Sequence, residues 1–183
     1  IVDRTKTGRV MIQASRNLKT EETLAIQFER IADQLDPPSR ALTEMARLIA
    51  NRLEIDVCSI YILEPDHQHL RLAATMGLNQ SSVGQVRMKI TEGLAGLVVE
   101  KNTQVSVPSA QDHSRFKYFP EAGEDRFTSF FGVPLNNGRL QRGVLAVQTI
   151  EAREFSDYEV DLICECAVAL SRHVNRCRLV EVI

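Results

Sequence analysis

The spacing of apolar residues changes twice along this chain, and this change limits the fold more than any single motif does. Apolar residues recur at helical spacing from residue 20 to residue 53, as in Leu24, Phe28, Ile31 and Leu35. Strand-like runs then fill the middle of the chain, and helical spacing returns after Ser156. Helices and strands do not alternate, which disfavours a doubly wound parallel sheet. The order predicts an α+β domain, with an antiparallel sheet, terminal helices on one face and an irregular segment on the other.

Turn and cap signals divide the chain into its elements. Pro37-Pro38 ends the first helix, and Asp36 is predicted to cap the second. Asn136-Asn137-Gly138 predicts a tight hairpin turn. Ser156 or Asp157 is predicted to cap the last helix, which runs to about residue 182. The predicted strands cover residues 57–63, 70–76, 86–90, 105–107, 129–135 and 143–150, with a short helix from Thr91 to Val98 between the third and the fourth.

The composition is that of a soluble globular domain, with 183 residues, 44% of them hydrophobic and 25% charged. A formal net charge of −2 gives no reason to expect nucleic acid or an anionic membrane as a partner. No apolar stretch approaches the roughly 18 residues of a membrane span, and the basic residues 1–20 lack the apolar core of a secretory signal. We therefore expect a cytoplasmic protein, with an N-terminal arm at residues 1–20 and one domain at residues 21–183.

The four cysteines, Cys58, Cys164, Cys166 and Cys177, follow no regular framework. Cys164 and Cys166 are two positions apart on a predicted helix, so their side chains point to nearly opposite sides and cannot grip one ion. The sequence therefore predicts buried thiols and no metal site. It also contains no recognisable catalytic motif, and we expect neither a catalytic set nor a cofactor in this chain.

The segment from residue 109 to residue 127 is the strongest indication of a functional site. Structureless connections of this length are uncommon in compact domains and are often functional. This segment and the strand after it hold more than half of the Phe and Tyr residues of the chain, with charged residues between them. Aromatic walls with a few polar groups are typical of small-molecule pockets. The other interpretation is a lid whose aromatic residues cover the sheet while its charges are solvated.

A second indication lies at the start of the short helix, where a Thr91 cap would leave backbone amides free to hold a carboxylate or phosphate. Ordinary capping with tight packing is the other interpretation. Ser129 and Gln148 are polar positions within strands, and each needs a partner in the protein or in a ligand. In the ligand hypothesis, Arg115 holds a carboxylate and Gln148 fixes its orientation. The predicted ligand-binding residues are Thr91, Gly93, Asp112, Arg115, Tyr118, Ser129, Phe131 and Gln148.

The last helix carries an apolar seam with alternating spacings of three and four residues, which includes Ile163, Leu170 and Val174. The seam extends over about two and a half heptads, fewer than a coiled coil usually needs. Two interpretations remain open: a helix that packs on its own sheet, and a dimer interface formed by these three residues. We expect a homodimer, in which the terminal helices serve dimerisation or signal relay.

Residues from about 40 to 180 resemble a GAF domain. The stretches that carry this resemblance are Val57–Leu63, Leu70–Gly77, Glu92–Gly96, Gly132–Leu135, Gly143–Gln148 and Phe155-Ser156. More narrowly, Ser114–Glu121 with Gly123-Glu124 and Ser129-Phe130 is similar to the GAF domain at the front of nitrogen-type phosphoenolpyruvate–protein phosphotransferases. No NKFDE-type motif of cyclic-nucleotide binding is present, and the 109–127 segment lacks the loop cysteines of free-methionine-sulfoxide reductases.

This resemblance implies a regulatory domain that senses a small metabolite, with glutamine or 2-oxoglutarate as candidates. It also implies partner domains further along a longer protein, in which any phosphotransferase activity would lie. Two alternatives stay open: a structural homodimerisation module without a ligand, and the GAF sensor of a nitrogen-regulated transcription activator.

Overall fold

The computed structural model describes residues 22–180, with side chains up to Asn175. The predicted arm at residues 1–20 lies outside the described residues. The helices are α2 (Leu24–Gln34), α3 (Pro38–Leu53), α4 (Gly93–Lys101) and α5 (Asp157–Val180), with short 3-10 helices η1 (Gln80–Ser82) and η2 (Ala110–Asp112). The strands are β1 (Val57–Leu63), β2 (His69–Met76), β3 (Arg87–Lys89), β4 (Val105–Val107), β5 (Ser129–Asn137) and β6 (Leu140–Thr149).

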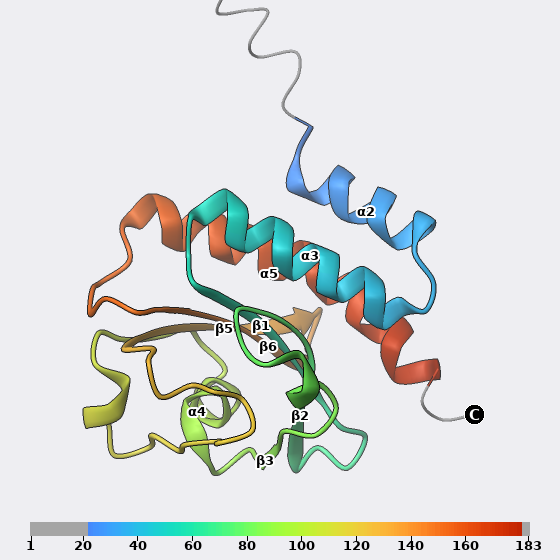
Figure 1. Ribbon diagram of the computed structural model, residues 1–183. Coiled ribbons are helices and arrows are strands. Elements are labelled where there is room, and N and C mark those ends of the chain that lie inside the picture. Colours follow the sequence, from blue (N-terminus) through green and yellow to red (C-terminus); the bar gives the residue numbers. More distant parts are fainter. Residues whose placement is uncertain (1–21, 181–183) are drawn as a thin grey trace, which may run out of the picture.

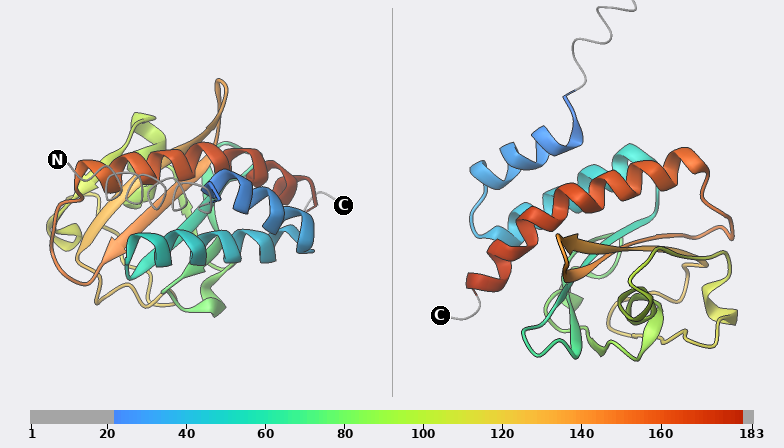
Figure 2. Two further views of the ribbon diagram at one scale, coloured as in Figure 1. Left: turned by 90° about the horizontal axis from the view of Figure 1, so that it is seen from above. Right: turned by 180° about the vertical axis from the view of Figure 1, so that it is seen from behind.

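The six strands form one antiparallel sheet in the order β3-β2-β1-β6-β5-β4. Helices α3 and α5 lie side by side on one face of this sheet, and α2 lies on their outer side (Figures 1 and 2). Helix α4 lies on the opposite face, beside the 109–127 segment (Figure 1). The predicted α+β fold is confirmed, including the helices on one face and the loop and short helix on the other. Among residues 22–180, no helix has both the length and the apolar character needed to cross a bilayer.

The central strands are buried on both faces, as their nearly continuous apolar runs predict. In β1, Cys58 and Ile60 face the helices, whereas Val57 and Tyr61 face α4. The sheet therefore separates two apolar cores, one below α3 and α5 and one below α4. Ile60 pairs with Ala74 and Tyr61 with Leu72, so Ala73 is an extra residue in β2, as in a β-bulge.

The apolar seam of α5 packs against its own sheet. Ile163, Leu170 and Val174 are each 0% exposed and belong to the helix-side core with Phe131 and Val147. The hypothesis that these three residues form a dimer interface therefore needs correction, because the sheet already covers them. The exposed apolar side chain in this part of α5 is Val168, on the opposite side of the helix.

The cap predicted for the second helix is also wrong. The N-cap of α3 is Pro37, and no side chain caps its amides. Pro38 occupies the first turn, where its missing N–H leaves no donor to satisfy and its fixed φ suits the helix. Asp36 is therefore not needed as a cap and stays exposed.

Helix α5 begins with a capping box, S-x-x-E, at Ser156 and Glu159. The Ser156 amide donates to Glu159 Oε2 at 2.8 Å, and the Glu159 amide donates to Ser156 Oγ at 3.4 Å. Arg153 adds a bidentate contact, with its two terminal nitrogens 3.1 and 2.9 Å from the Glu159 oxygens. Hydrogen bonding to Arg153 is the main cause that lowers the pKa of Glu159 to about 2.

Glu159→Gln is expected to lower the free energy of unfolding by about 1–2 kcal/mol at pH 7. The folded state has the lower pKa, so the stabilisation is complete above pH 4.5 and disappears as the pH falls toward about 2. Urea denaturation of both proteins at pH 7 and near pH 2 tests this, and the difference should shrink in acid. A difference that does not change with pH would contradict the assignment.

Candidate functional site

A small cavity lies between the sheet face that carries α4, the start of α4 and the 109–127 segment. Its volume is about 30 Å³, which is room for one or two water-sized groups. Most of its wall is apolar, with Phe116, Phe119 and Phe130 as the aromatic part. The polar part of the wall consists of Tyr61, Lys117, Glu124 and Gln148.

Two neighbouring strands place Tyr61 and Gln148 in this wall. In the β1–β6 pairing, Val57 is opposite Gln148 and Tyr61 is opposite Val144, so both polar side chains leave the same face of the sheet. Ala146 stands between them on β6 and also lines the cavity. Its small side chain leaves the space that a larger residue would fill.

A tight turn brings Glu124 under the sheet. The turn is fixed to the end of β2, because the Asn79 amide donates to the Ala122 carbonyl at 3.0 Å and Asn79 Nδ2 donates to the Glu121 carbonyl at 3.1 Å. Gly123 has φ +71 and packs on the Asn79 side chain, so the turn needs glycine at this position. The Glu124 side chain is consequently only 8% exposed.

Burial changes the acid–base properties of this site. Loss of solvation, with a smaller contribution from Glu121, raises the pKa of Glu124 to about 7. Burial, and secondarily the charge of Glu124, raises the pKa of Tyr61 well above its usual range. Among the described residues, none hydrogen-bonds to the Tyr61 hydroxyl, the Glu124 carboxyl or the Gln148 side-chain amide. Buried polar groups of this kind take a partner from water or from a ligand.

Two ion pairs hold the 109–127 segment over α4. Arg115 Nη1 lies 2.8 Å from Glu100 Oε2, and Lys117 Nζ lies 2.8 Å from Glu92 Oε2. Arg115 also donates from Nη2 to the Ile90 carbonyl at 3.4 Å. The two terminal guanidinium nitrogens therefore fasten the segment, whereas the buried Nε has no hydrogen-bond partner among the described residues. The contact of Arg115 with a ligand carboxylate stays a prediction.

Two of the predicted ligand-binding residues, Gly93 and Gln148, line the cavity. Three others lie away from it. Thr91 is exposed and is not the helix cap, because α4 has Glu92 at its N-cap position without a side-chain bond. Asp112 is exposed and accepts a hydrogen bond from Ser109 at 2.6 Å, and Tyr118 is also exposed.

Ser129 and Phe131 lie on the opposite face of the sheet. Phe130 pairs with Gln148 across β5 and β6, so the residues on either side of Phe130 point toward the helices. Ser129 hydrogen-bonds to Thr149, and the Phe131 ring packs 5.5 Å from the Phe155 ring. Tyr61, Glu124 and Phe130 line the cavity and are not among the residues predicted from the sequence. Counting alternate positions back from the predicted turn at 136–138 would have placed Phe130 on the same face of the sheet as Gln148.

Gly96 in α4 lets the backbone at Ile90 come close to the helix, which requires a residue without a side chain at this position. A Cβ on Gly96 would lie 2.6 Å from the Ile90 carbonyl oxygen. Gly96→Ala is expected to lower the free energy of unfolding by about 1–3 kcal/mol, because either α4 or Ile90 must move. Thr91→Ala is the control, with an expected change within about 0.5 kcal/mol. Urea denaturation decides, and equal losses in the two variants would contradict both assignments.

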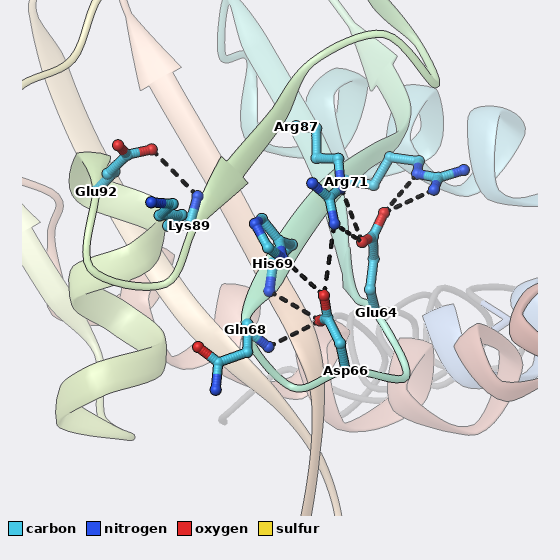
Figure 3. A network of polar contacts seen from close by, with 8 residues as sticks. All are labelled: Glu64, Asp66, Gln68, His69, Arg71, Arg87, Lys89 and Glu92. Carbon is cyan, nitrogen blue, oxygen red and sulfur yellow. Dashed lines mark hydrogen bonds and ion pairs between the residues drawn. The ribbon is translucent and has the colours of Figure 1, made fainter.

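A cluster of Glu64, Asp66 and His69 also brings possible metal ligands together, with the three ligand atoms within 4.8 Å of one another. Figure 3 shows why it needs no ion. Arg71 and Arg87 pair with Glu64 at 2.7 and 2.8 Å, and His69 Nδ1 lies 2.7 Å from Asp66. The two guanidinium groups neutralise the carboxylates, so the cluster ties the β1–β2 turn to β3.

The described cysteines are free thiols. Cys58 and Cys166 are fully buried in the helix-side core, and burial raises the pKa of both thiols. Cys164 is partly buried, and burial raises the pKa of its thiol as well. Raised pKa values keep these thiols protonated and unreactive at neutral pH.

Residues 38–172 match the GAF domain family. Together with the six-stranded sheet and its loop-covered face, this match shows that the chain belongs to the GAF domain family.

Within that family the chain is similar to domains of one kind of protein. An Escherichia coli protein described as phosphoenolpyruvate-dependent phosphotransferase system is 31% identical over 141 residues, which cover 77% of this chain and 19% of that protein. The chain thus spans about a fifth of the length of this curated relative.

Two solved structures have the same fold. The GAF domain from a Coxiella burnetii phosphoenolpyruvate-protein phosphotransferase has 28% identity and a TM-score of 0.77, covering 87% of this chain and 95% of that one. The GAF domain from an Acinetobacter phosphoenolpyruvate-protein phosphotransferase has 30% identity and a TM-score of 0.72, covering 89% of this chain and 100% of that one.

Proposed function

We propose that this chain is the small-molecule-sensing regulatory domain of a phosphoenolpyruvate–protein phosphotransferase. The similarity to GAF domains of phosphoenolpyruvate-protein phosphotransferases supports this choice of full-length protein. The observation that carries the sensing role is the cavity below α4, whose wall contains three buried polar side chains to which no described residue hydrogen-bonds. Phosphotransfer itself belongs, in this proposal, to other domains of the full-length protein, which the sensor controls. Glutamine and 2-oxoglutarate are the first candidate metabolites.

The 109–127 segment must move to admit a metabolite of that size, because a volume of about 30 Å³ holds only one or two water-sized groups. The two ion pairs that fasten the segment, Arg115–Glu100 and Lys117–Glu92, are partly exposed. Exposed pairs of this kind contribute about 0–1 kcal/mol each. Breaking these two pairs is therefore inexpensive, and the main cost of opening is the exposure of the buried apolar side chains of the segment, among them Phe119 and Phe127. A ligand that restores this burial can hold the segment closed.

Thermal unfolding of the domain against glutamine, 2-oxoglutarate and cyclic nucleotides tests this function. A ligand at about 100 times its dissociation constant stabilises the folded state by about 2.7 kcal/mol. For a domain of this size the melting temperature should rise by roughly 5–10 °C. A selective rise with one metabolite is expected, and no rise with any of them would count against the sensing role.

A homodimerisation module without a ligand is the second candidate, and the small volume of the cavity favours it. Such a dimer must use other residues than the buried seam of α5. The exposed apolar side chains on the helix layer are Ile26 of α2 with Tyr158 and Val168 of α5. Sedimentation over a range of concentrations decides: a monomer throughout would remove this candidate.

A further inference from the structure

The polar groups of the cavity indicate which chemical group it holds. Glu124, Tyr61 and Gln148 are 8%, 4% and 7% exposed, and no described residue bonds to their polar atoms. An unpartnered buried carboxyl group is the most costly of the three, because an ionised carboxylate loses far more solvation energy than a hydroxyl or an amide. A hydrogen-bond donor with a positive charge would satisfy it best.

The aromatic wall favours the same kind of group. Phe116, Phe119 and Phe130 line the cavity, and aromatic faces attract cations. The protein itself gives an example, because the Lys117 ammonium nitrogen lies 5.3 Å from the centre of the Phe119 ring. An ammonium group is close to a water molecule in size and fits a volume of about 30 Å³.

A ligand group with a negative charge has few favourable partners at this site. The three cations of the covering segment are engaged in the protein: Lys117 pairs with Glu92 and Arg115 with Glu100, each at 2.8 Å, and the Arg126 guanidinium lies 4.9 Å from the centre of the Phe127 ring. A ligand carboxylate placed in the cavity would instead face the Glu124 carboxyl group. The charges therefore select against an acid at the inner end of the site.

We infer, resting on the proposed sensing function, that the cavity holds the protonated amine of the metabolite, with Glu124 accepting its hydrogen bonds. The Tyr61 and Gln148 oxygens can accept further bonds from the same group. The metabolite is thus an amine-bearing compound, such as an amino acid, and the rest of it extends toward the 109–127 segment. An oxo acid that lacks the amine leaves the carboxyl group unpaired and binds less well.

Binding should also release protons. Burial raises the pKa of Glu124 to about 7, and an ammonium partner favours the ionised form. The charged or titratable groups around it are Tyr61 on β1, Glu121 in its own turn and Lys117 on the covering segment. Affinity should therefore rise as the pH passes from 6 to 7, a range in which an α-amine stays largely protonated.

Calorimetric titration with three probes tests the inference: L-glutamine, L-glutamate and 2-oxoglutarate. The last two differ only in an amine and an oxo group. The wild-type domain is expected to bind at least one amine-bearing probe, and L-glutamate at least tenfold more tightly than 2-oxoglutarate. Glu124→Gln should weaken amine binding at least tenfold and remove the proton release. Glu121→Gln, which changes an exposed acid of the same turn, should leave the affinity within about twofold.

The possible failures are distinguishable. Tight binding of 2-oxoglutarate that Glu124→Gln does not weaken would overturn the inference while the sensing function stands. Amine binding that survives in a folded Glu124→Gln variant would also overturn it. If none of the three probes binds the folded wild-type domain, that result would count against the proposed sensing function, and therefore also against the inference that rests on it. Circular dichroism of each variant establishes that it is folded.

Discussion

Ile163→Asp is expected to unfold the domain. Ile163 is 0% exposed in the core between α5 and the sheet, where the buried neighbours described for it are apolar. An unpaired buried charge destabilises a protein by more than about 4 kcal/mol, and the whole stability of a domain is about 5–15 kcal/mol. The cooperative thermal transition and the near-ultraviolet circular dichroism should therefore be lost or greatly weakened.

Val168→Asp is the matched control on the same helix. Val168 is 62% exposed, so a carboxylate there stays in water and the stability should change by less than about 1 kcal/mol. If the seam of α5 instead faced a second protomer, Ile163→Asp would give a stable folded monomer. That result would contradict the packing of α5 on its own sheet.

Glu124→Gln is expected to stabilise the domain at pH 8 in the absence of ligand. The folded state holds the pKa of Glu124 at about 7, above its ordinary value of 4.5, so the folded state binds the proton more tightly than the unfolded state does. Stability therefore falls as the pH rises from about 4.5 to about 7, and the full penalty remains above that range. Removing the charge should recover about 2–3 kcal/mol at pH 8.

Urea denaturation of wild type and variant at pH 4.5 and pH 8 measures this effect. The two proteins should differ little at the lower pH and most at the higher one. Glu121→Gln, in the exposed part of the same turn, should change stability by less than about 0.5 kcal/mol. Loss of stability in Glu124→Gln at pH 8 would show that the carboxylate has a partner in the folded protein. If Glu124→Gln is more stable than wild type and no longer binds an amine, then the Glu124 carboxyl group serves binding and lowers the stability of the domain.

The order of helices and strands follows directly from the sequence, because each element has a period or a turn signal of its own. The alternation of β5 and β6 around the 136–138 turn and the helical spacing of α2 and α3 are examples, and the structure confirms them. The capping box of α5 also appears in the sequence as Ser156 with Glu159. Each of these features depends on residues close together in the sequence, so it can be predicted without knowledge of the tertiary structure.

The site was less predictable because it depends on which face of the sheet each residue occupies. A shift of one position moves a side chain to the other face, and this separates Phe130 at the cavity from Phe131 below the helices. Glu124 depends on a contact distant in sequence, with Asn79 after β2. In the sequence alone it is one acid among several in a charged segment, and its burial cannot be inferred from its neighbours.

The most direct test of the account is an amide NMR titration of the wild-type domain with L-glutamine. We expect the largest chemical-shift changes at the backbone amide of Gly93 and the side-chain amide of Gln148, with further changes in residues 109–127. Helix α5 should change little, since the sheet separates it from the cavity. Saturable changes centred on α2 and α5, with Gly93 and Gln148 unaffected, would contradict a sensing site below α4.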